Sequence, residues 1–181
     1  LPLFLSMPVF GALGTIFMLT SEYRRERLFT LLGLTSGEEL SLGYHIKQIL
    51  IALGSGGIFG LGFGQSRQKF QYLPEVASDS IFAIIGEELG FIGTTFVVML
   101  FGFFIYKGLS IAKKATDNVG RMLAVGITSW MGLQFFVNIA AMTKLIPLTG
   151  VPLPLISYGG SSMIFSLMGL GVLASIGRKK E

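Results

Sequence analysis

The segment DSIFAIIGEELGFIGTTFVVMLFGFFIY, residues Asp79–Tyr106, joins a long apolar run to carboxylates at its beginning. After Gly90 it contains no charged residue, and it is longer than the roughly 20 apolar residues that cross a bilayer as a helix. Asp79, Glu87 and Glu88 precede that point. An ionised group that enters hydrocarbon costs several kcal/mol unless it is paired or solvated. We therefore expect a membrane helix whose first turns carry functional residues.

The composition is that of a membrane protein. Hydrophobic residues make up 51% of the chain, charged residues 13%, and the mean hydropathy is +0.71. A soluble domain usually carries about 25% charged residues. We predict an all-α integral membrane protein in one domain, with four transmembrane helices at about 1–19, 80–106, 122–142 and 157–176 and one large loop at about 20–79. Membrane lipids are expected partners. The net charge of +4 indicates no nucleic-acid partner, because the basic residues lie at predicted membrane edges.

Basic residues indicate the topology. The connection 107–121 contains four basic residues and one acid, and the tail after the last predicted span adds three basic residues. Short basic segments face the cytoplasm, so the C-terminus is expected to be cytoplasmic and the large loop extracytoplasmic. The chain has no cysteine, which excludes disulfides. Because it begins at Leu1 without a basic leader, we expect a fragment of a longer membrane protein.

The large loop contains a helical pattern of its own. Apolar residues recur at helical spacing from Tyr44 to Leu53, which predicts an amphipathic helix. The glycine-rich sequence after it, beginning at Gly54, ends that pattern. We expect this part to lie on the membrane surface or to re-enter the membrane beside protein, because exposed irregular backbone is not tolerated in lipid.

Asp79 has two compatible interpretations. An Asp directly before an apolar helix suits a capping role, because its carboxylate can accept a backbone N–H. It could equally be a general base at the water–membrane boundary. Glu87 and Glu88 are adjacent, so their side chains point about 100° apart on a helix and at most one is expected to share a cavity with Asp79. We predict that this pair forms structural ion pairs.

Cationic residues on the outer side could bind a phosphate group. The loop carries six Lys and Arg residues, which are either a solvated face that touches headgroups or a clamp for a phosphate-bearing substrate. Arg67 and Lys69 lie about ten residues before Asp79 and are the preferred candidates. Glu75, between them and Asp79, is included in the candidate substrate-binding set. His45 has no ligand partner at metal spacing, and we predict an interfacial role for it.

The connection before the last predicted span contains three prolines, and the span begins with the run Ser157–Ser162, with sequence SYGGSS. Ser157 can cap the following helix, and Gly159 and Gly160 permit close helix packing. Free N–H groups at that helix start could instead bind an anion. These three residues therefore complete the candidate substrate-binding set.

Several separated motifs together resemble the SEDS family (shape, elongation, division and sporulation), which includes FtsW, RodA and SpoVE, with FtsW and SpoVE the closer branch. The matching pieces are the glycines of 54–62, Gln65-Ser66 with Lys69, Tyr72-Leu73-Pro74-Glu75, Asp79, Ile81-Phe82-Ala83, Gly86-Glu87-Glu88-Leu89-Gly90, and Pro152–Ser162. The family commonly has His-Thr before the Asp and Phe after it, where this chain has Ala77-Ser78 and Ser80. The missing His puts an Asp–His hydrogen bond in doubt.

The resemblance implies a bacterial cytoplasmic-membrane protein with about ten helices, of which this chain resembles the last four. It also implies polymerisation of lipid II into peptidoglycan glycan strands during cell division or elongation, with Asp79 as the catalytic residue. A class B penicillin-binding protein transpeptidase is the implied partner. This chain alone is expected to be inactive. No cofactor is firmly indicated, although a divalent cation, Mg²⁺ or Mn²⁺, could assist departure of the diphosphate. The alternatives are a flippase for the lipid-linked precursor and a noncatalytic division scaffold.

Overall fold

The computed structural model describes residue 29 and residues 41–66 and 79–178. Within these ranges it contains four helices and no strand: α3 (Ser41–Ser55), α5 (Ile81–Lys114), α6 (Asn118–Met142) and α7 (Gly160–Arg178). The predicted all-α fold is confirmed. The expected span at about 1–19 and much of the large loop at 20–79 lie outside the described residues.

Three helices, α5, α6 and α7, are long and apolar enough to cross a membrane. They overlap the predicted spans, but α5 continues to Lys114, α6 begins at Asn118 and α7 begins only at Gly160. The early start of α6 follows from its cap, because the Asp117 carboxylate accepts a hydrogen bond of 2.9 Å from the Gly120 N–H. Only 11% of the most apolar window of α5 is buried, so its large side chains form an outer surface suited to lipid or to further membrane helices.

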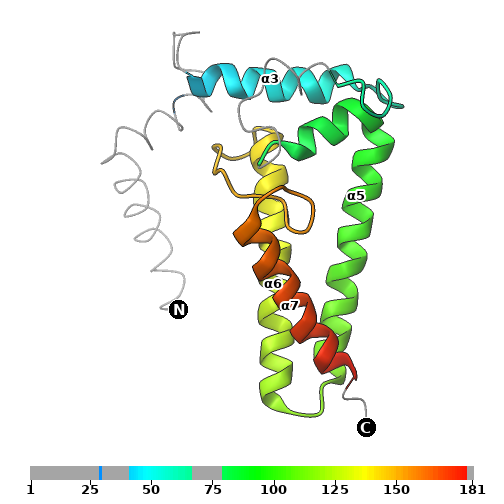
Figure 1. Cartoon of the computed structure of the whole chain (residues 1–181), viewed down its shortest axis with the longest axis vertical. Helices are drawn as coiled ribbons and strands as arrows, with labels where there is room; N and C mark the ends of the chain where they lie inside the picture. The colour runs from blue at the N-terminus through cyan, green and yellow to red at the C-terminus, as the bar shows by residue number, and fades with distance from the viewer. Residues whose placement is uncertain (1–28, 30–40, 67–78, 179–181) are drawn as a thin grey trace, which may run out of the picture.

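The helices α5 and α6 run antiparallel, and α7 crosses them (Figure 1). At their centre the rings of Phe101 and Phe135 stack with centroids 4.0 Å apart. Closer to the α5–α6 turn, Gly108 lies against Thr128, where a Cβ on the glycine would be 2.3 Å from the Thr128 Oγ1. A missing side chain thus allows the two backbones to approach, as is common between membrane helices.

Helix α3 lies across one end of the three long helices (Figure 1). On the face of α3 that meets the bundle, Ile49 and Ala52 are fully buried, and Ile46 and Leu53 pack against the same core. Leu50, in contrast, is 40% exposed, because it points about 100° away from Ile49. The amphipathic helix predicted over Tyr44–Leu53 is confirmed, and Leu50 lies on its exposed side.

Helix α5 is broken at Gly90, whose φ of 66° and ψ of −163° are not helical. A segment that we call the glycine loop, residues 56–62, pairs with the backbone on both sides of this break. The bonds run from Leu61 N to Glu87 O (2.9 Å), from Gly62 N to Glu88 O (3.0 Å), from Phe91 N to Gly57 O (2.9 Å) and from Ile92 N to Ile58 O (3.2 Å). Irregular backbone at membrane depth requires such pairing. The glycine loop is thus paired with the backbone of α5, and its predicted position relative to the membrane stays a prediction.

Candidate functional site

Asp79 lies at the same end of the bundle as α3, directly before the first turn of α5, and is partly buried. The N-cap residue of α5 is Ser80, and its side chain makes no capping hydrogen bond. The prediction that Asp79 caps this helix is therefore wrong, since the helix begins one residue too late for that role. Its carboxylate instead lies near the Ser80 hydroxyl and the turn at Gly150.

A buried amide fixes the backbone at Asp79. The Asn138 Nδ2 donates two hydrogen bonds of 2.8 Å, one to the Asp79 carbonyl and one to the Val151 carbonyl. Asn138 is 1% exposed and comes from the last turns of α6. One side chain thus ties together the start of α5, the end of α6 and the connection to α7.

The connection between α6 and α7 forms the other wall beside Asp79. Gly150 has a φ of 67°, and a Cβ there would lie 3.9 Å from the Asp79 Oδ2. The Gln134 Nε2 donates to the Pro152 carbonyl at 2.9 Å, which holds the connection against α6. The Oδ2 atom of Asp79 therefore faces the turn at Gly150.

The other carboxylate oxygen of Asp79 is engaged by its neighbour. The Ser80 hydroxyl donates to the Asp79 Oδ1 at 3.3 Å and lies 3.2 Å from the His45 Nε2. Ser80 is fully buried, and His45 comes from α3. His45, which we predicted to be an interfacial histidine, is thus linked to Asp79 through Ser80.

Glu87 and Glu88 differ in their surroundings. Glu87 is 1% exposed, and its Oε2 accepts a hydrogen bond of 2.5 Å from the Ser66 hydroxyl. Glu88 is 8% exposed, and its buried Oε1 has no hydrogen-bond partner in the described part of the chain. The predicted ion pairing of these residues stays a prediction.

The substrate-binding candidates are only partly described. Arg67, Lys69 and Glu75 lie outside the described residues, so their roles stay predictions. The Ser157 hydroxyl is buried and accepts a hydrogen bond of 2.7 Å from the Leu153 N–H. Because this bond closes a turn of the connection and α7 begins three residues later, the predicted capping role of Ser157 is wrong.

The two glycines that follow show little of the predicted close packing. A Cβ on Gly160 would meet no atom within 4 Å, and one on Gly159 would meet only Ser162 of the next turn. No other helix of the described part packs closely on them. Their predicted roles in anion and substrate binding stay untested.

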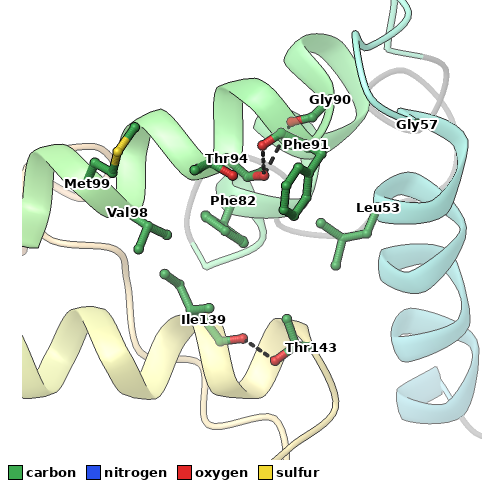
Figure 2. A pocket seen from close by; sticks show the side chains of 12 residues that line it. Leu53, Gly57, Phe82, Gly90, Phe91, Thr94, Val98, Met99, Ile139 and Thr143 are labelled. Atoms are coloured by element: carbon green, nitrogen blue, oxygen red, sulfur yellow. Dashed lines mark hydrogen bonds between the residues drawn. The ribbon is translucent and has the colours of Figure 1, made fainter.

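A pocket of about 430 Å³ opens next to this site, between the end of α3, the broken part of α5 and the end of α6 (Figure 2). Leu53, Phe82, Phe91, Val98 and Ile139 contribute most of its apolar side chains. Gly57, Gly86, Gly90, Thr94, Thr95, Met99 and Thr143 complete the lining. Phe91 and Val98 are largely exposed, so the outer rim faces away from the bundle.

Metal binding finds no support within the described part of the chain, where no three His, Asp or Glu side chains converge to hold a metal ion. The divalent cation considered for diphosphate departure therefore remains a prediction.

Sequence reasoning missed Asn138 and Ser80 as site residues. For Asn138 a signal was present, since an amide within an apolar span is itself a candidate functional residue. For the link between Ser80 and His45 no local signal exists, because the two residues are 35 positions apart and meet only through the packing of α3.

Comparison with known proteins identifies the relatives. The model of the FtsW/RodA/SpoVE family, described as cell cycle protein, matches residues 2–181. Stage V sporulation protein E of Bacillus subtilis is 46% identical over 97% of this chain and 48% of its own length. A Bacillus subtilis protein named probable peptidoglycan glycosyltransferase FtsW is 50% identical over 75% of this chain and 34% of its own length. The chain thus spans about half the length of these curated relatives, or less.

Solved structures have the same fold. A chain of a peptidoglycan synthase complex matches with a TM-score of 0.72 and 24% identity, over 99% of this chain and 49% of that one. The rod shape determining protein RodA of Thermus thermophilus matches with a TM-score of 0.54 and 32% identity, over 72% of this chain and 39% of its own. Together with the three apolar helices, these similarities define a multi-pass membrane protein.

The particular family follows from the sequence match along the whole chain. The chain belongs to the FtsW/RodA/SpoVE family of cell cycle proteins, which confirms the resemblance inferred from its motifs.

Proposed function

We propose that the whole protein is a peptidoglycan glycosyltransferase that polymerises lipid II, with Asp79 as the general base. The name of the FtsW relative supports this reaction class. The observation that carries the choice of Asp79 is that both its backbone and its carboxylate are held. Asn138 binds the carbonyl and Ser80 binds Oδ1, while Oδ2 faces the turn at Gly150. A base held in this way loses little freedom when the substrate binds.

The proposed chemistry is a single displacement with inversion at the anomeric carbon of the donor sugar. A hydroxyl oxygen of the acceptor sugar forms the new glycosidic bond while the bond from the anomeric carbon to the diphosphate breaks. Asp79 takes the hydroxyl proton, and the polyprenyl diphosphate leaves with the electron pair. A positioned general base accelerates such a step by about 10²–10⁴-fold.

Charge on the leaving diphosphate requires cationic partners. Arg67 and Lys69 are our candidates, since guanidinium and ammonium groups bind phosphate oxygens well. A divalent cation could share that role. Both assignments remain part of the proposal.

The apolar pocket supports a lipid-linked substrate. Phe82, three residues after Asp79, and Ile139, directly after Asn138, both line it, so the pocket and the proposed base share the same helix ends (Figure 2). We assign the pocket to the first isoprene units of the polyprenyl tail. Burying apolar area of this kind contributes about 25 cal/mol per Å².

Charge asymmetry supports an outward-facing site. Lys113, Lys114, Arg121 and Arg178 are exposed at the end of the bundle that contains the α5–α6 turn and the C-terminal end of α7, opposite to Asp79 (Figure 1). Short basic segments lie in the cytoplasm. We therefore propose a cytoplasmic C-terminus, and α3 with the Asp79 site on the outer side of the cytoplasmic membrane.

The test is polymerisation of lipid II by the purified full-length protein with a class B penicillin-binding protein, the partner we propose because crosslinking must follow polymerisation. Asp79→Asn should lower the rate by at least about 100-fold without changing thermal unfolding. The matched control is Asp117→Asn, because Asp117 caps α6 at the opposite end and Asn is an equally good cap. Control activity should equal that of the wild type.

Other outcomes would overturn parts of the proposal. Normal polymerisation by Asp79→Asn would remove Asp79 as the base. Transfer of labelled lipid II across vesicle membranes without polymer would favour the flippase, and partner binding without either activity would favour the scaffold. A lipid II analogue with a short tail should have a higher KM, and an unchanged KM would contradict the assignment of the pocket.

A further inference from the structure

Ser80 is a buried polar residue at a position where helix capping would be its ordinary use. It occupies the N-cap position of α5, yet its hydroxyl makes no capping bond and points instead to Asp79 and His45. It is 0% exposed, so these contacts are shielded from water. A buried hydroxyl directed at two titratable side chains calls for an explanation beyond helix formation.

The direction of the hydrogen bonds follows from the chemistry of a hydroxyl group. A serine has one O–H to donate and two lone pairs to accept. A Ser80 hydroxyl that donates to the Asp79 Oδ1 requires the His45 tautomer whose Nε2 carries a proton, and we assign that tautomer to the contact of 3.2 Å. The chain therefore runs from the imidazole N–H through the serine hydroxyl to the carboxylate.

We propose that His45 and Ser80 are positioning residues that orient the Asp79 carboxylate for catalysis, an inference that rests on the proposed function. The Ser80 contact at Oδ1 restrains the rotation of the carboxylate and so sets the direction of Oδ2. That atom faces the turn at Gly150, so the acceptor sugar hydroxyl binds between Asp79 and this turn. His45 in turn fixes the serine hydroxyl and connects the base to α3.

The residues around Asp79 in this chain differ from the family pattern at two positions that bear on this arrangement. In the family pattern described above, a His lies two residues before the Asp and a Phe directly follows it, whereas this chain has Ala77 and Ser80. A phenylalanine at position 80 could not bridge a histidine to the carboxylate. In this chain the link between a histidine and Asp79 runs through Ser80 to a residue 34 positions before Asp79.

The test is a double-mutant cycle in the lipid II polymerisation assay with the full-length protein and its transpeptidase partner. Ser80→Ala and His45→Leu should each lower kcat by about 10- to 100-fold, because a small misplacement of a catalytic group has an effect of this size. KM should stay within about twofold, since a positioning residue acts on the Asp79 carboxylate and not on the substrate. The double variant should be no slower than the slower single variant, because both substitutions interrupt one chain.

Conservative variants separate positioning from general damage. Ser80→Thr keeps the hydroxyl, and His45→Gln keeps an N–H donor near the position of Nε2. At least one of these variants should recover kcat to within about threefold of the wild type. Thermal unfolding of each purified variant shows whether it is folded.

Two results would overturn the inference. One is wild-type kcat in a folded Ser80→Ala variant, and the other is losses that multiply in the double variant. Full activity of Asp79→Asn would instead overturn the proposed function. Inactive Asp79→Asn together with fully active Ser80→Ala would refute the positioning role alone.

Discussion

Substitution of Gly56 by alanine should destabilise the protein through a backbone clash. Gly56 begins the glycine loop, and an added Cβ would lie 1.9 Å from the Gly86 carbonyl oxygen, 2.8 Å from its carbon and 3.0 Å from the Glu87 Cα. All three are backbone atoms, so no side-chain rotation relieves the contact. The loop and α5 would have to separate by about 1 Å or more to restore an ordinary contact distance.

Such a separation would break the pairing at the break in α5. The four hydrogen bonds between the glycine loop and α5 measure 2.9–3.2 Å, and another ångström would exceed hydrogen-bonding distance. Each contributes a net of about 0.5–1.5 kcal/mol. We therefore expect Gly56→Ala to lower the free energy of unfolding by about 2–6 kcal/mol.

Gly54→Ala is the matched control. Gly54 lies two residues earlier, in the last turn of α3, is exposed, and would place its Cβ within 4 Å of no atom. Alanine there should be neutral or stabilising by up to about 1 kcal/mol, because glycine is the poorer helix former.

The assay is thermal unfolding of the purified full-length protein in detergent. The shift is about 2–4 °C per kcal/mol for 150–250 residues and smaller for a longer protein, so Gly56→Ala should lower the midpoint of the full-length protein by at least about 2 °C. It should also lower polymerisation, because the loop supports the α5 segment that begins beside Asp79. Equal midpoints for Gly56→Ala and Gly54→Ala would refute the packing argument.

Further predictions concern the amide, the buried acids and the topology. Asn138→Leu should lower the unfolding free energy by about 1–3 kcal/mol for each carbonyl left unpaired. An unchanged unfolding free energy, measured by calorimetry, would contradict this prediction. Glu88→Met should change the midpoint little, because its Oε1 already lacks a partner. Glu87→Met should lower the unfolding midpoint, because the hydrogen bond to Ser66 is lost. An equal drop in the midpoint of the Glu88→Met variant would indicate that Glu88 has an ion-pair partner. In a background without other cysteines, an impermeant maleimide applied to cells should label Tyr158→Cys but not Val119→Cys, and the reverse would invert the proposed topology.

Apolar run length determined the membrane helices without help from tertiary structure. A bilayer requires about 20 apolar residues per helix, so composition alone indicated the spans that became α5, α6 and α7. Their ends were less predictable. The start of α6 depends on the Asp117 cap, and the start of α7 depends on the use of the Ser157 hydroxyl within the preceding connection.

The sequence alone singled out Asp79 as a candidate, because a carboxylate at a membrane edge is costly and the surrounding motifs resemble a known family. Its surroundings were not predictable from the sequence. Asn138, Ser80 and His45 meet Asp79 only because α3 lies across the end of the bundle and α6 ends beside the start of α5. Contacts between residues far apart in sequence depend on helix packing, which the local pattern does not encode.

The break in α5 is likewise determined partly by the sequence and partly by the tertiary structure. The sequence determined that glycines would interrupt the helical pattern after residue 54, since glycine adopts conformations that other residues avoid. It did not determine which segment of the chain would pair with the backbone of the glycine loop. Only the tertiary structure brings the glycine loop to Gly90, where its N–H and C=O groups pair with those that the broken helix leaves open. The physical reason is that an unpaired backbone group costs several kcal/mol in an apolar environment, so the break and the loop are stable only together.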